Sequence, residues 1–292
     1  MNEATGFVRR ETPDTLVRAE LREHAIHYPT AATLSSRIQE IEREKGQGLF
    51  TASYIGEGVL KRPILRVDSV GGDPQKRVVL MGSIHGDEVD GAIGLTYSCV
   101  DLFRAAKEAN VQLTIIPIAN VGGYDLSQQG CPELFHVSKE GDPDSINLNR
   151  KWPDYLPVAE GTPPIYRLLN QVLTERGAPL VIVSYHADED LVKHFYNYVF
   201  GEKSAVEVAL DTALKRHFKP LPVESQSLMG DPSDVGKLTE PGKVRDHHDG
   251  SLEDYLSTMG SIAFCIDLPA GGGIKKRVAS VRDTALAVIQ AV

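Results

Sequence analysis

The sequence RVVLMGSIHGDE, residues 77–88, decides the expected fold, because a continuous apolar run leads directly into a polar turn that contains glycine. The apolar residues at 78–81 show no polar alternation, which is typical of a strand buried on both faces. Residues 91–107 have the pattern of a helix, and residues 111–118 have that of a second apolar strand. An apolar strand, a helix and another apolar strand in this order predict a parallel β-α-β unit.

The same alternation continues toward both ends of the chain. Further strands are predicted at residues 50–55, 63–70, 180–184, 194–201 and 262–268, and further helices at 34–42, 165–176, 204–217 and 275–291. Together they predict one α/β domain over residues 1–292, with a mixed, largely parallel central sheet and helices on both faces. Residues 1–33 are expected to form an N-terminal helical extension. Residues 122–163 show little periodicity, and a loop of that length in a compact domain is often functional.

Composition and charge exclude several classes of protein. The chain has 292 residues, 41% of them hydrophobic, and a net charge of -9, which disfavours contact with a nucleic-acid backbone. Its apolar runs fall far short of the roughly 20 residues that a membrane helix needs. The N-terminus lacks a signal-peptide pattern, and Cys99, Cys131 and Cys265 form no CxxC pair. We therefore expect a cytoplasmic protein with buried thiols that binds neither nucleic acid nor membrane, and the oligomeric state stays open.

His85 and Glu88 are candidate metal ligands, because they lie three residues apart in the turn after an apolar strand. Gly82 and Gly86 flank this motif and permit a sharp turn. His186 follows another apolar strand, 101 residues after His85. Since the carboxyl ends of parallel strands meet at one edge of a sheet, the fold can bring the three side chains together. Two histidines and one carboxylate, with the fourth position left for water, make up a hydrolytic zinc site.

A second HxxE at residues 186–189 weakens any argument from this motif alone. We interpret Asp188 and Glu189 as nearby polar residues, one of which could accept a hydrogen bond from the His186 imidazole. His85 taken alone is equally well explained as a loop histidine with ordinary hydrogen bonds. The zinc interpretation therefore depends on the set of three ligands.

The order of motifs along residues 34–290 resembles the zinc carboxypeptidase (metallocarboxypeptidase) family. Five segments carry the resemblance: HGDE at 85–88, NLNRKW at 147–152, SYH at 184–186, GSLEDY at 250–255 and FCIDLP at 264–269. In order, they are similar to the family's HxxE zinc motif, its carboxylate-binding motif, its third zinc ligand, its side-chain pocket and its general-base strand. The first two segments look closest to small bacterial members such as murein-peptide amidases.

This resemblance implies a zinc hydrolase that removes a C-terminal residue from short peptides. One Zn²⁺ per chain would be held by His85, Glu88 and His186. Asp267 would act as the general base that takes a proton from the attacking water. Asn147 stands where many members have an aspartate that holds a zinc histidine.

The resemblance also implies where the substrate binds. Asn149 and Arg150 would hold the free C-terminal carboxylate of a short peptide, because a guanidinium can grip a carboxylate through two parallel hydrogen bonds. Leu252 or Glu253 would lie at the floor of the side-chain pocket, the former favouring an apolar residue and the latter a basic one. Trp152 is expected to be a packing anchor for the carboxylate-binding loop.

Three departures from the family pattern affect the catalytic machinery. Asp267 replaces the expected glutamate, so the carboxylate is one methylene shorter. Between Val121 and Asn149 there is no arginine to polarise the substrate carbonyl, and Lys139 is only a weak substitute. The segment RDHHD at 245–249 has no tyrosine before Gly250; either of its histidines could approach the substrate, although a solvated loop is favoured.

Two other functions remain open at this point. One is a zinc deacylase of N-acyl amino acids, related to aspartoacylase and succinylglutamate desuccinylase, which shares the metal set and the arginine. The other is a peptide-binding protein that kept the fold and the zinc but has weakened catalysis, as the three departures suggest.

Overall fold

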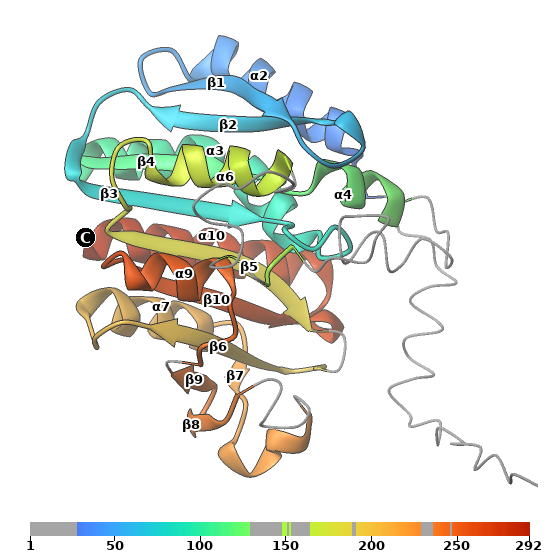
Figure 1. The fold of residues 1–292 in the computed structure, drawn as a ribbon, viewed down its shortest axis with the longest axis vertical. Helices are drawn as coiled ribbons and strands as arrows, with labels where there is room; N and C mark the ends of the chain where they lie inside the picture. Colours follow the sequence, from blue (N-terminus) through green and yellow to red (C-terminus); the bar gives the residue numbers. More distant parts are fainter. Residues whose placement is uncertain are drawn as a thin grey trace, which may run out of the picture.

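One sheet of ten strands runs through the molecule, with helices on both of its faces (Figure 1). The computed structural model describes residues 28–128, 148–150, 152, 164–188, 191–228, 236–245 and 247–292. The strands are β1 (Phe50–Glu57), β2 (Pro63–Ser69), β3 (Asp73–Gly82), β4 (Val111–Ile116), β5 (Val181–Asp188), β6 (His194–Phe200), β7 (Lys219–Pro220), β8 (Leu238–Glu240), β9 (Lys243–Arg245) and β10 (Ile262–Pro269). The helices are α2 (Ala31–Lys45), α3 (Asp90–Glu108), α4 (Val121–Ser127), α6 (Pro164–Thr174), α7 (Ala205–Lys215), α9 (Leu252–Thr258) and α10 (Ile274–Ala291), with short 3-10 turns at Val59–Lys61, Val223–Leu228 and Ala270–Gly272.

The strand order is β1-β2-β4-β3-β5-β10-β6-β9-β8, with β7 paired to β6. The four central strands β4, β3, β5 and β10 are parallel to one another. The neighbouring pairs β2–β4 and β10–β6 are antiparallel, so the sheet is mixed. This arrangement confirms the predicted α/β class with a mixed central sheet.

Helices cover the two faces of the sheet with separate apolar clusters. In Figure 1, α3, α7 and α10 lie behind the sheet, while α6 and α9 lie in front of it. The first group contributes buried residues such as Leu102, Leu210 and Val288 to one cluster. The second group contributes Leu169 and Leu252 to the other. Every central strand is therefore covered on both faces, which explains why these strands carry continuous apolar runs.

The long elements agree with the sequence prediction to within a few residues, whereas short ones were missed. Helices α4 and α9 have seven residues each, and β7 to β9 have two or three. Such lengths are too short to show a period of 3.6 or 2 clearly. Because α4 lies at the start of the predicted loop 122–163, the expectation of no regular structure there is wrong for its first residues. Most of that loop, and most of the predicted extension 1–33, lie outside the described residues.

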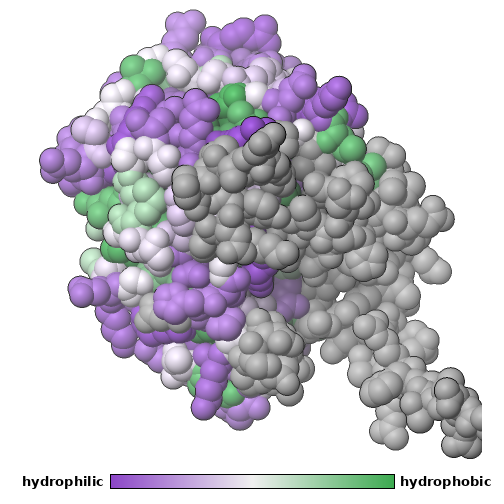
Figure 2. Space-filling model, viewed as in Figure 1, coloured by the Kyte–Doolittle hydropathy of each residue, from purple (hydrophilic) through white to green (hydrophobic). Residues whose placement is uncertain are grey.

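The part of the surface visible in Figure 2 is mainly hydrophilic. Figure 2 shows hydrophilic side chains over much of the visible face, with apolar residues in small separate groups. Cys99 and Cys265 are buried free thiols, as predicted, while Cys131 lies outside the described residues. In the part of the chain that the structure describes, no helix combines the length and the apolar character needed to cross a bilayer.

Candidate metal centre and active site

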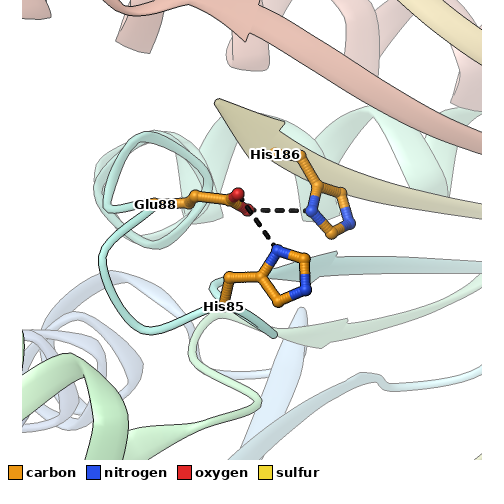
Figure 3. A group of neighbouring side chains, drawn as sticks. All are labelled: His85, Glu88 and His186. Atoms are coloured by element: carbon orange, nitrogen blue, oxygen red, sulfur yellow. Dashed lines mark hydrogen bonds and ion pairs between the residues drawn. The ribbon is translucent and has the colours of Figure 1, made fainter. Parts of the chain in front are cut away.

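His85, Glu88 and His186 converge at the carboxyl ends of β3 and β5 (Figure 3). The Glu88 carboxylate lies between the two imidazoles, with Oε1 3.0 Å from Nδ1 of His85 and Oε2 2.8 Å from Nδ1 of His186. One ligand atom from each residue lies within 4.8 Å of the other two. All three side chains are largely buried. The structure thus brings together the three predicted ligands, and this set of two nitrogens and one carboxylate suits Zn²⁺.

The loop that carries His85 and Glu88 is held in a tight turn. Ser83 adopts a positive φ of 47°, and its hydroxyl donates to the Glu88 carbonyl at 2.7 Å. A Cβ on Gly86 would lie 2.1 Å from the carbonyl carbon of Gly123 in α4. Only glycine permits that approach. Helix α4, which the sequence pattern did not predict, therefore packs directly against the loop that carries His85 and Glu88.

The charge state of Glu88 also suits a metal ligand. Burial alone would raise the pKa of this carboxyl, but the adjacent His85 and His186 outweigh burial and hold the pKa well below its usual range. The carboxylate therefore stays ionised, which is the form that binds a cation.

Asp267 lies beside this centre on β10. In the sheet register it is the direct partner of His186 on β5 and of Tyr196 on β6. Burial raises the pKa of Asp267 well above its ordinary value, and the charges of Glu88 and Asp188 act in the same direction. A carboxylate with a raised pKa is a stronger base. This environment suits the proton-accepting role that the sequence predicted.

The predicted carboxylate-binding segment meets the predicted pocket segment. The Asn149 side chain accepts a hydrogen bond from Leu252 N at 3.0 Å and donates one to Glu253 Oε2 at 3.1 Å. Arg150 Nη1 lies 3.2 Å from Asp249 Oδ2 and donates to its neighbour's carbonyl. The two segments, about a hundred residues apart in the chain, are therefore joined at the site.

The individual roles in substrate binding stay predictions. Leu252 and Glu253 are both fully buried, so neither is distinguished by exposure as the pocket floor. Trp152 is confirmed as a packing anchor: it is 1% exposed, its ring lies 4.8 Å from that of Tyr166, and its backbone N–H donates to the Gly250 carbonyl at 3.0 Å.

The loop before α9 gives a mixed result for its two histidines. The His248 side chain is 74% exposed and lies 2.7 Å from Asp254 Oδ1, in keeping with a solvated loop. The His247 ring instead stacks on Tyr198, with ring centroids 6.2 Å apart. The sequence analysis missed Tyr196 and Tyr198, although their alternation in β6 places both on the face that carries Asp267. Lys139, Asn147 and Glu189 lie outside the described residues.

Comparison with known proteins identifies the family. The model of the zinc carboxypeptidase family matches residues 37–212, which include His85, Arg150 and His186 but not Asp267. No curated protein matches the sequence significantly.

Solved structures share the fold at low sequence identity. A protein from Shewanella denitrificans OS217 has a TM-score of 0.65 at 19% identity, over 88% of each chain. A metallo-carboxypeptidase from Burkholderia cenocepacia has a TM-score of 0.57 at 15% identity, over 89% of this chain and 68% of that one. A metallo-carboxypeptidase from Pseudomonas aeruginosa, in complex with (2-guanidinoethylmercapto)succinic acid, has a TM-score of 0.57 at 16% identity, over 88% of this chain and 67% of that one. Because the family match covers more than half of the 292 residues, this chain belongs to the zinc carboxypeptidase family.

Proposed function

We propose that this metallopeptidase removes the C-terminal residue from short peptides that end in a free carboxylate. The observation that carries the proposal is the placement of Asp267 directly beside His186, at the edge of the sheet where the three candidate metal ligands meet. A buried carboxylate next to a two-histidine, one-carboxylate centre is the arrangement needed to activate water for hydrolysis.

His85, Glu88 and His186 would hold one Zn²⁺, which supplies a Lewis acid that polarises the scissile carbonyl. Asp267 takes a proton from the attacking water and returns it to the nitrogen of the leaving amino acid. Burial raises the pKa of Asp267, which makes its carboxylate a stronger proton acceptor in the first step. The C–O bond to the water oxygen forms first, and the peptide C–N bond then breaks once the leaving nitrogen has received the proton.

Arg150 supports the choice of a C-terminal residue over an internal peptide bond. Its side chain is 36% exposed, so the guanidinium can reach a ligand, and its contact with Asp249 Oδ2 is made through Nη1. Nη2 and Nε also carry N–H donors, and a guanidinium edge with two donors suits a carboxylate. Asn149 is engaged by the pocket segment through its side chain and thereby fixes the position of the neighbouring Arg150.

The proposal is tested with three sets of substrates on the zinc-loaded protein: di- and tripeptides with a free carboxylate, the same peptides amidated at the C-terminus, and N-acyl amino acids. We expect release of the C-terminal amino acid from the free-acid peptides and resistance of the amidated ones. Turnover of N-acyl amino acids alone would establish a deacylase. Bound zinc without turnover of any of the three sets would establish a binding protein.

The predicted set of metal ligands is tested separately, with a double variant. The double variant His85→Ala, His186→Ala removes two of the three ligands, and we expect it to lose both zinc and activity while the parent retains one zinc per chain. Zinc retained by the double variant, measured by elemental analysis after dialysis, would contradict this ligand set.

A further inference from the structure

Ser184 is a buried polar residue on β5 whose register partners on the two adjacent strands are apolar. In the register of the central strands its partners are Met81 on β3 and Cys265 on β10. Its side chain is 1% exposed and lies on the same face of β5 as His186, two residues further along. A hydroxyl in such surroundings is costly unless it makes a hydrogen bond.

The partner of this hydroxyl is the metal-ligand candidate itself. Ser184 Oγ lies 3.1 Å from Nε2 of His186, while Nδ1 of the same ring lies 2.8 Å from Glu88 Oε2. Both nitrogens of the imidazole are thus engaged, Nε2 by Ser184 on the same strand and Nδ1 by Glu88 in the loop after β3. These two contacts fix the direction in which Nδ1 points.

We propose that Ser184 is a positioning residue of the metal centre, which holds the His186 ring with Nδ1 directed at the ion. When Nδ1 is a ligand, the proton of the neutral ring resides on Nε2, and the buried Nε2–H donates to Ser184 Oγ. The register neighbours of Ser184 carry sulfur, which is a weak acceptor, so the serine hydroxyl is the strong acceptor in this row. The inference rests on the metal centre described under the proposed function.

From the sequence, Asp188 or Glu189, which follow His186, could take such a role. The structure shows the Tyr196 hydroxyl donating to Asp188 Oδ2 at 3.0 Å, and Glu189 lies outside the described residues. Ser184, His186 and Asp188 alternate along β5 and share one face, and the observed contact to Nε2 of the His186 ring is made by the Ser184 hydroxyl. Side chains at i and i+2 lie on one face of a strand, and Ser184 therefore faces the same layer as the ring.

The test measures Zn²⁺ affinity by competition with a chromophoric chelator, using the full chain stripped of metal and titrated with zinc sulfate. We expect Ser184→Ala to weaken zinc binding by about 10- to 100-fold, the range for loss of an outer-shell partner. Ser184→Thr keeps the hydroxyl and should restore most of the affinity. Ser261→Ala is the matched control, because Ser261 is also a buried serine, bonded to the Pro179 carbonyl at 2.6 Å just before β10 begins, at the opposite end from Asp267.

Equal zinc affinity of folded Ser184→Ala and the parent would overturn the inference, as would an equal loss in Ser261→Ala. If Ser184→Ala does not fold, nitrogen-15 NMR of the zinc-loaded parent decides: a slowly exchanging Nε2–H on His186 supports the role, and a rapidly exchanging one refutes it. A parent that binds no zinc would remove the metal centre and this inference together. A parent that binds zinc without hydrolysing peptides, and whose affinity falls in Ser184→Ala, would refute the proposed function alone.

Discussion

Asp267 and His186 are direct partners in the parallel pairing of β10 and β5. Direct partners on adjacent strands point to the same face at the same level, so the candidate base and one candidate ligand emerge side by side. Both are largely buried, at 8% and 3% exposure. The carboxylate predicted to act as the general base thus lies next to a candidate metal ligand, and its function can be tested directly.

Asp267→Asn should lower peptide hydrolysis by about 10²- to 10⁴-fold, the contribution of a positioned general base. The amide keeps the shape of the side chain but cannot accept the proton from water. Zinc content should match that of the parent, because Asp267 is not among the three candidate ligands. Initial rates and metal analysis on the same preparation check both points, and parental turnover would exclude Asp267 as the base.

Asp267→Glu tests whether the shorter side chain limits the natural protein. A positional error near 1 Å can cost on the order of 10²-fold in rate, and a base that is already well placed should lose activity when lengthened. We therefore expect reduced kcat/KM. A strong gain in activity would indicate that the natural site is weakened and would favour a binding protein.

Arg150→Lys should raise KM for free-acid peptides, because lysine cannot form two parallel hydrogen bonds to a carboxylate. Stability should change little, since the side chain is 36% exposed. The matched control is Arg282→Lys on α10, where the arginine pairs with Asp101 and both side chains are 50% exposed. Steady-state kinetics of the two variants would contradict the carboxylate clamp if their KM values agreed.

Arg277→Met should destabilise the protein by about 3–5 kcal/mol, because it leaves the buried Asp90 without its charge partner. Arg277 Nε donates to Asp90 Oδ2 at 2.7 Å, and Nη1 donates to the Ala270 carbonyl. Urea denaturation measures the loss, and adding Asp90→Asn should recover part of it by removing the uncompensated charge. Arg282→Met breaks the exposed ion pair with Asp101 and should lower the free energy of unfolding by only about 0–1 kcal/mol. Equal losses of stability in Arg277→Met and Arg282→Met would contradict the argument.

Glu207 should make stability depend on acid pH. Burial alone would raise the pKa of this carboxyl, but hydrogen bonds from Lys243 and Arg245 outweigh burial and lower the pKa. A carboxyl with a lowered pKa in the folded protein contributes stability above its unfolded pKa, near 4.3, and this contribution is lost as pH falls through the folded value. In the parent, the free energy of unfolding should therefore fall below about pH 4 more steeply than in Glu207→Gln.

The measurement is urea denaturation at a series of pH values, with the exposed Glu108 changed to glutamine as the control. Removing the buried acceptor should also lower the neutral-pH stability of Glu207→Gln, because Lys243 Nζ lies 2.6 Å from Glu207 Oε1. Parallel pH profiles for Glu207→Gln and the parent would rule out this source of acid sensitivity.

The sequence alone determined the α/β class, the long helices and the central strands. A buried strand is apolar along its length and a long helix repeats its apolar face, so both patterns are visible without a structure. His85, Glu88 and His186 can also be identified from the sequence as candidate ligands, because each lies at or after the end of an apolar run and polar residues at strand ends meet at one sheet edge.

Which side chains touch one another depends on the folded arrangement of the strands. His186 and Glu88 are 98 residues apart, and Asn149 and Glu253 are 104 apart, so their contacts depend on strand order and register, which local pattern does not encode. Helices α4 and α9 are too short to show a period, yet α4 packs against Gly86 and α9 begins at the pocket segment. The contact of Ser184 Oγ with the His186 ring, from which its proposed role is inferred, likewise depends on the folded geometry of β5 and its neighbours.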